Sequence, residues 1–159
     1  MQTEKNVAQA NITYSLVLKT ELGKQLSGLT LRLVNALTGL AQQNTFAKII
    51  AKLDQDLEAE KKAVEGPIHN VTTFPVTYKK HVVVIDTTTV VLLQLLSDLD
   101  KVAQRWYDLY FTGKMSPEEF EQKKQEWRGR FRHASLKVNA IKRRNGNNGA
   151  NGREGKGAS

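Results

Sequence analysis

The sequence predicts a mostly helical α+β protein in which a short antiparallel β ribbon lies on a helical body. Polar and apolar residues alternate in residues 11–19, and residues 78–86 contain a run of four β-branched residues, as in two strands. Leucines recur every three or four residues in the segments that follow, which is typical of amphipathic helices. With 159 residues, of which 40% are hydrophobic and 25% charged, the chain has the length and composition of one globular domain.

The first half of the chain contains one predicted strand and two predicted helices. Residues 1–10 are polar, and we expect them to be flexible. The strand over 11–19 is followed at once by a helix over about 21–42, for which Thr20 is a suitable N-cap. A second helix is predicted over about 44–64. The apolar residues that share one face of the strand are Ile12, Tyr14, Leu16 and Leu18.

The second half contains another strand and two more helices, followed by a tail. The strand over 78–86 leads into a helix that ends at Gly113. Residues 116–119, Ser-Pro-Glu-Glu, form a capping box with proline at the first helical position and so predict the start of the fourth helix. We expect this helix to reach about residue 144. Residues 145–159 hold five of the eleven glycines and four asparagines, and we expect them to be disordered.

Positive charge is concentrated at the C-terminal end of the chain. Residues 1–121 hold 13 Lys and Arg against 14 Asp and Glu, whereas residues 122–159 hold 11 against 2. The last quarter therefore carries a net charge of +9, more than the +8 of the whole chain. Such an asymmetry favours an anionic polymer or surface as partner.

Residues that would form an active site or a metal centre are scattered. The three histidines, His69, His81 and His133, show no helical metal-ligand spacing, and the chain has no cysteine. Asp98 and Asp100 are two residues apart on a predicted helix, so they diverge, and we interpret them as surface carboxylates. We therefore expect no enzyme activity, no metal and no cofactor.

Membrane insertion and secretion are not predicted. The apolar runs are far shorter than the roughly 20 residues that a bilayer span requires. The first ten residues, MQTEKNVAQA, lack the charged and then apolar layout of a signal peptide. We expect a cytoplasmic protein without a membrane partner.

A strand followed closely by two helices is the layout of the ribbon-helix-helix DNA-binding unit. In such units two antiparallel strands enter the major groove, so one face must be apolar and the other must reach base edges. In the first strand Asn11, Thr13 and Ser15 have suitable side chains, and Lys19 is placed to reach a phosphate. The second strand offers Lys79, Lys80 and His81 instead. The same alternation also describes any half-buried strand, so the pattern leaves open whether either strand reads DNA. It also leaves open which of the two would do so.

The fourth helix and its extension offer cations for the DNA backbone. Arg128, Arg132, Arg143 and Arg144 are candidates for phosphate contacts, which would give sequence-independent and salt-dependent affinity. Arg128, Arg130 and Arg132 lie on different sides of the helix, so not all of them can meet the same DNA. The tryptophan and phenylalanine of this segment fall on its apolar stripe, and we expect them in the core.

Four segments resemble the AcaB-type regulators encoded on conjugative plasmids and integrating conjugative elements. The resemblance covers about residues 11–138 and depends on pattern more than on an invariant motif. The segments are ITYSLVLKTELGKQL, FAKIIAKLDQDLEAEKKAVE, FPVTYKKHVVVID and VVLLQLLSDLDKVAQRWYDLYFTGKMSPEEFEQKKQEWRGRFRHAS.

The resemblance implies a ribbon-helix-helix fold and a role in activating the transcription of conjugative transfer genes. Residues 11–144 would then form the DNA-binding domain of a bacterial homodimer that binds promoter DNA, with RNA polymerase as a further partner. One alternative is an adaptor protein of a conjugation apparatus, whose helix stripes bind other proteins. Another is an RNA-binding protein, for which exposure of Trp106 or Trp127 would be expected.

Overall fold

The computed structural model describes residues 12–37, 44–65, 74–84 and 87–157. The elements in chain order are β1 (Ile12–Leu18), α2 (Glu21–Leu37), α3 (Asn44–Ala63), β2 (Tyr78–Val84), α4 (Thr87–Phe111) and α5 (Pro117–Gly157). The predicted class is confirmed: these residues form a mostly helical α+β structure with a two-stranded antiparallel sheet.

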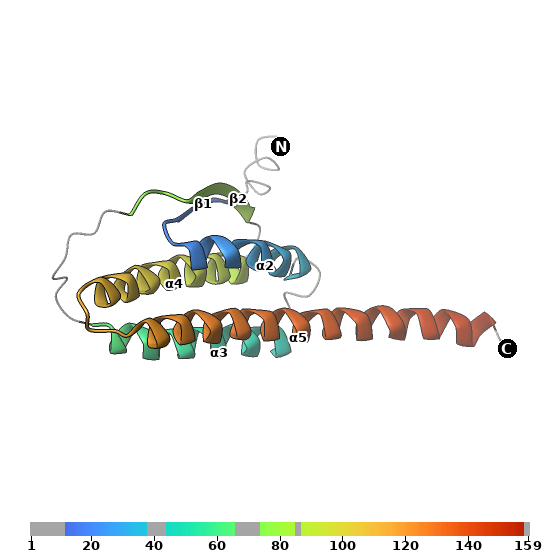
Figure 1. Cartoon of the computed structure of the whole chain (residues 1–159). Coiled ribbons are helices and arrows are strands. Elements are labelled where there is room, and N and C mark those ends of the chain that lie inside the picture. The colour runs from blue at the N-terminus through green and yellow to red at the C-terminus, as the bar shows by residue number, and fades with distance from the viewer. Residues whose placement is uncertain (1–11, 38–43, 66–73, 85–86, 158–159) are drawn as a thin grey trace, which may run out of the picture.

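The elements form three layers (Figure 1). The two strands lie on one side of the molecule, α2 and α4 form the layer beneath them, and α3 and α5 lie on the far side. β1 packs on α4, and α2 packs on both α4 and α5. The ribbon is therefore separated from α5 by a layer of helices.

The predicted apolar stripes converge in one core. Leu16 and Leu18 of β1 are fully buried, as are Trp106 of α4 and Trp127 and Phe131 of α5. Burial of Trp127 confirms its predicted place in the core, and burial of both tryptophans removes the feature that would have favoured stacking on RNA bases.

Local signals set the helix ends where the sequence predicts them. Thr20 caps α2, because its hydroxyl accepts a hydrogen bond from the backbone N–H of Gly23 at 3.1 Å. Ser116 caps α5 in the same way, with the N–H of Glu119 at 3.1 Å from its hydroxyl oxygen. Gly113, with φ of 75°, follows α4 in the left-handed conformation that glycine adopts without steric cost.

The tail differs from the prediction. Residues 145–157 continue α5 as a helix, although their glycines and asparagines predict disorder. This segment contains no proline, and a helix that has already formed gains one hydrogen bond for each residue added. Figure 1 shows this end of α5 extending past the other helices. The expected flexible segment, residues 1–10, lies outside the described residues.

Candidate nucleic-acid interface

The two candidate strands form a single ribbon. β1 and β2 pair antiparallel, with Ser15 opposite His81 and Thr13 opposite Val83. All four of these residues are exposed on the face that points away from the helices, because their neighbours Leu16 and Val82 are buried. The structure thus brings Thr13 and Ser15 of the first predicted group and His81 of the second onto one surface, which we call the outer face of the ribbon.

Cationic side chains flank the outer face. Lys79 is exposed on the same face, opposite the half-buried Val17. Lys80 pairs with Leu16 and so belongs to the opposite face of β2, although it is exposed. Lys19, just beyond the end of β1, is exposed as well. The remaining predicted ribbon residue, Asn11, lies outside the described residues.

Val83 is a member of the outer face that the sequence argument did not include. Its exposed fraction is 58%, so its methyl groups are accessible near the end of β2. The sequence of β2 could have predicted this position of Val83. Lys79, His81 and Val83 are spaced two residues apart, so they share one face of the strand. A valine at this place can meet the methyl group of thymine, an apolar contact that proteins use to recognise this base.

A buried carboxylate holds the ribbon and α2 against α4. Asp100 of α4 accepts hydrogen bonds from the backbone N–H groups of Lys19 and Thr20, both at 2.9 Å, and from the Thr20 hydroxyl at 2.6 Å. Gly23 packs so closely that a Cβ atom in its place would lie 2.5 Å from an Asp100 carboxylate oxygen. The end of β1 and the start of α2 are therefore fixed to a single side chain.

The interpretation of Asp100 as a surface carboxylate was wrong, because its exposed fraction is only 2%. Asp98 is more accessible and forms an ion pair with Lys61 at 3.0 Å, in accordance with its interpretation as a surface group. The sequence does contain a signal for this difference: Leu96, Leu99 and Ala103 mark the buried stripe of α4, and Asp100 falls on it.

Two further contacts fix the orientation of the ribbon. The hydroxyl of Tyr14 hydrogen-bonds to that of Ser97 on α4 at 3.2 Å. Thr77, just before β2, donates to the carbonyl oxygen of Leu18 from its backbone N–H at 2.9 Å and from its hydroxyl at 3.1 Å. Because the ribbon is anchored from its inner face, its outer face can present side chains in fixed positions.

The arginines of α5 do not join the ribbon surface. A helix turns about 100° per residue, so Arg128, Arg132 and Arg143 lie within about 60° of one another on α5. The prediction that Arg128, Arg130 and Arg132 lie on different sides of the helix is therefore wrong for Arg128 and Arg132. Arg128 donates a hydrogen bond to Gln25 of α2 at 2.9 Å, and the other two are exposed. Since α5 lies across the α2–α4 layer from the ribbon, the predicted cations form a separate surface (Figure 1). Arg144 belongs to α5, but its side chain lies outside the described part of the chain.

An acidic residue moderates the positive field near the start of this arginine surface. Lys124 lies 2.6 Å from Glu121, and this hydrogen bond lowers the pKa of Glu121. The charges of Lys124 and Arg128 lower this pKa further. Glu121 therefore stays ionised to a lower pH than an ordinary glutamate, and its negative charge offsets part of the charge of Arg128.

Comparison with known proteins identifies a similar fold. The chain is similar in structure to AcaB from uropathogenic E. coli, with a TM-score of 0.70 and 12% sequence identity. The alignment covers 92% of this chain and 87% of AcaB. The chain has an AcaB-like fold. No protein-family model matches the sequence, and no curated protein is significantly similar to it.

The likeness to AcaB spans nearly the whole chain. At 12% identity this likeness shows a similar fold only. What the ribbon can bind has to be argued from its own residues. Within the described ranges, no helix has both the length and the apolar character needed to cross a membrane. Nor do the described residues include a group of three His, Cys, Asp or Glu that could hold a metal ion.

Proposed function

We propose that this protein binds duplex DNA in a sequence-specific manner and regulates transcription, with the β ribbon in the major groove. The observation that carries this proposal is the outer face of the ribbon, where Thr13, Ser15, His81 and Val83 are exposed together on a rigidly anchored pair of strands. The major groove is about 12 Å wide and admits a two-stranded ribbon. AcaB-like folding is consistent with a regulatory role.

Each part of the ribbon has a distinct role in this proposal. Thr13 and Ser15 donate or accept hydrogen bonds at base edges, and Val83 contacts a thymine methyl group. Lys79 contacts phosphates and supplies affinity that does not depend on sequence. Lys19, which is exposed just beyond the end of β1, extends this phosphate contact along the groove, whereas Lys80 belongs to the opposite face of β2.

The finer features of the proposal follow the resemblance to AcaB-type regulators. The active form is a ribbon-helix-helix-like homodimer that recognises two half-sites in promoters of conjugative transfer genes and activates them, with RNA polymerase as a partner. Both strands of the ribbon come from one chain, so the ribbon itself is complete in a monomer. Dimerisation then serves to set the spacing of two half-sites.

The experiment begins by mapping bound sites across the genome and measuring affinity for the recovered site by fluorescence anisotropy. Thr13→Ala should weaken the cognate site by roughly 1–3 kcal/mol and relax the preference at one base pair. The control is Thr112→Ala, because Thr112 is also exposed but lies at the turn after α4. Equal affinities for Thr13→Ala and Thr112→Ala would exclude base reading by β1.

A second pair of variants tests the phosphate contacts. Lys79→Ala should weaken cognate and random duplexes alike and reduce the slope of log affinity against log salt by about one. Lys114→Ala makes the same change of charge at the exposed turn between α4 and α5 and should leave the slope unaltered. An adaptor protein predicts neither a salt slope nor a preference for the recovered site over random duplex.

A further inference from the structure

A cleft of about 280 Å³ lies between α3 and α5, on the far side of the molecule from the ribbon. Its floor is apolar: Leu53 and Ala134 are buried, and Ile49 is half-buried. The volume is just below the range of about 300–1,000 Å³ for small-molecule sites, so only a small ligand would fit; such sites are mostly apolar with a few polar groups at fixed positions. The cleft is not part of the proposed DNA surface.

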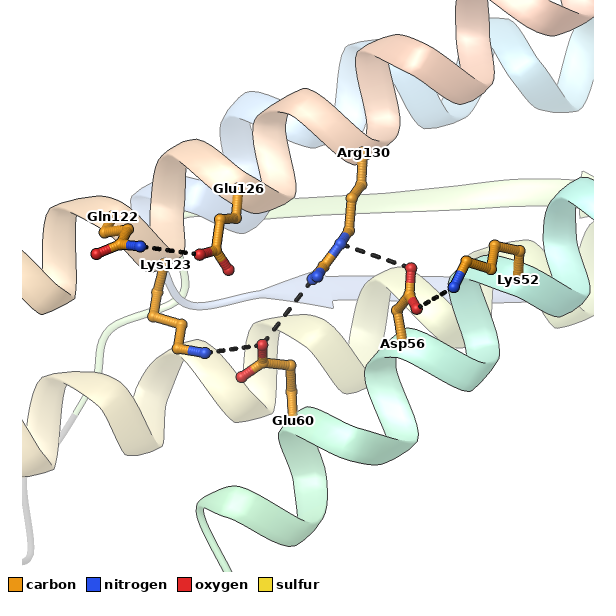
Figure 2. A network of polar contacts seen from close by, with 7 residues as sticks. All are labelled: Lys52, Asp56, Glu60, Gln122, Lys123, Glu126 and Arg130. Atoms are coloured by element: carbon orange, nitrogen blue, oxygen red, sulfur yellow. Dashed lines mark hydrogen bonds and ion pairs between the residues drawn. The ribbon is translucent and has the colours of Figure 1, made fainter.

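The walls of the cleft carry more positive than negative charge. Figure 2 shows Lys52 of α3 and Arg130 of α5 both directed at the same carboxylate, Asp56, with distances of 3.0 and 3.5 Å. Lys137 also lines the cleft, is exposed, and has no hydrogen bond or ion pair with any described residue. The cleft therefore holds three cations against one carboxylate, and only two of the cations are paired with it.

Glu60, one turn further along α3, does not neutralise the excess of positive charge in the cleft. Arg130 also approaches Glu60 at 3.9 Å, but Glu60 is paired at 3.0 Å with Lys123 (Figure 2). Lys123 and Glu60 cancel each other's charge. The three cations of the cleft therefore still exceed its one carboxylate by two positive charges. The guanidinium of Arg130 is also held 4.6 Å from the centre of the Trp127 ring, so its position is fixed from both sides.

We propose that this cleft binds a small molecule that combines a phosphate group with an apolar body. A phosphate monoester carries up to two negative charges near neutral pH, which matches the excess on the walls. The fixed guanidinium of Arg130 donates to the phosphate oxygens, and the ammonium groups of Lys52 and Lys137 complete the contact. The apolar body packs on Leu53, Ile49 and Ala134.

The proposal is tested on the full-length protein with phenyl phosphate as the probe, using isothermal titration calorimetry and amide NMR shifts of α3 and α5. Phenyl phosphate should bind saturably and more tightly than inorganic phosphate, whereas benzyl alcohol should not bind. Lys137→Ala should weaken binding roughly tenfold, because one charge-assisted contact is lost. Lys48→Ala, an exposed lysine of α3 outside the cleft, is the matched control and should have no effect.

Three results would overturn the proposal. One is the absence of saturable binding, and the second is an equal loss of affinity in Lys137→Ala and Lys48→Ala, which would indicate a general charge effect. The third is displacement of phenyl phosphate from the α3–α5 amides by duplex DNA, which would make the cleft a contact for the nucleic-acid backbone. Loss of DNA binding in ribbon variants would leave the proposal intact, since the cleft is a separate site.

Discussion

Replacing Asp100 with alanine tests whether one buried carboxylate anchors the ribbon. The substitution removes the acceptor for the backbone N–H and the hydroxyl of Thr20, and Thr20 is itself only 2% exposed. It also removes the partner of the Lys19 N–H, which is closer to solvent. Each buried donor left without an acceptor costs about 1–3 kcal/mol, so the free energy of unfolding should fall by about 2–5 kcal/mol.

The measurement is urea unfolding followed by the fluorescence of Trp106 and Trp127, which are both fully buried and should change on unfolding. Asp98→Ala is the matched control, two residues away on the same helix. It removes a partly exposed ion pair with Lys61, for which a loss of at most about 1 kcal/mol is expected. If the two variants lost equal stability, the anchoring role of Asp100 would be refuted.

Two further predictions concern helix ends and use the same unfolding measurement. Gly113→Ala should lower the free energy of unfolding by about 1–2 kcal/mol, because the φ of Gly113 is 75°. Gly129→Ala is the control inside α5, where a Cβ atom meets nothing within 4 Å, and it should raise the free energy of unfolding by about 0.5–1 kcal/mol. Effects of the same sign at both glycines would contradict this. Ser116→Ala should cost about 1 kcal/mol by removing the N-cap of α5, and unchanged stability would show that the cap is dispensable.

The secondary structure could be predicted well because its signals are local. The apolar residues recur every two residues in 11–19 and every three or four residues from 21 onward. This change of period places the boundary between β1 and α2 near Thr20, as the structure shows. The capping box at 116–119 places the start of α5 at Pro117. Each of these signals acts through contacts between residues close together in the chain.

The composition of the interface was less predictable because it depends on contacts between distant residues. Ser15 and His81 are 66 positions apart, and only the strand register shows that they share the outer face. The alternation in each strand predicts which residues share a face, but it does not predict which strand it pairs with or in what register. Asp100 was misinterpreted for the same reason, since its partners belong to a segment about 80 residues earlier in the chain.

The distribution of charge along a sequence also differs from its distribution over a surface. The last 38 residues carry a net charge of +9, but Arg128 and Arg130 point about 160° apart around α5. One binds Gln25 of α2, and the other pairs with carboxylates of α3. The basic helix therefore supplies its cations to two different surfaces. Because neither surface adjoins the ribbon, base recognition in the proposed function depends on the ribbon and not on α5.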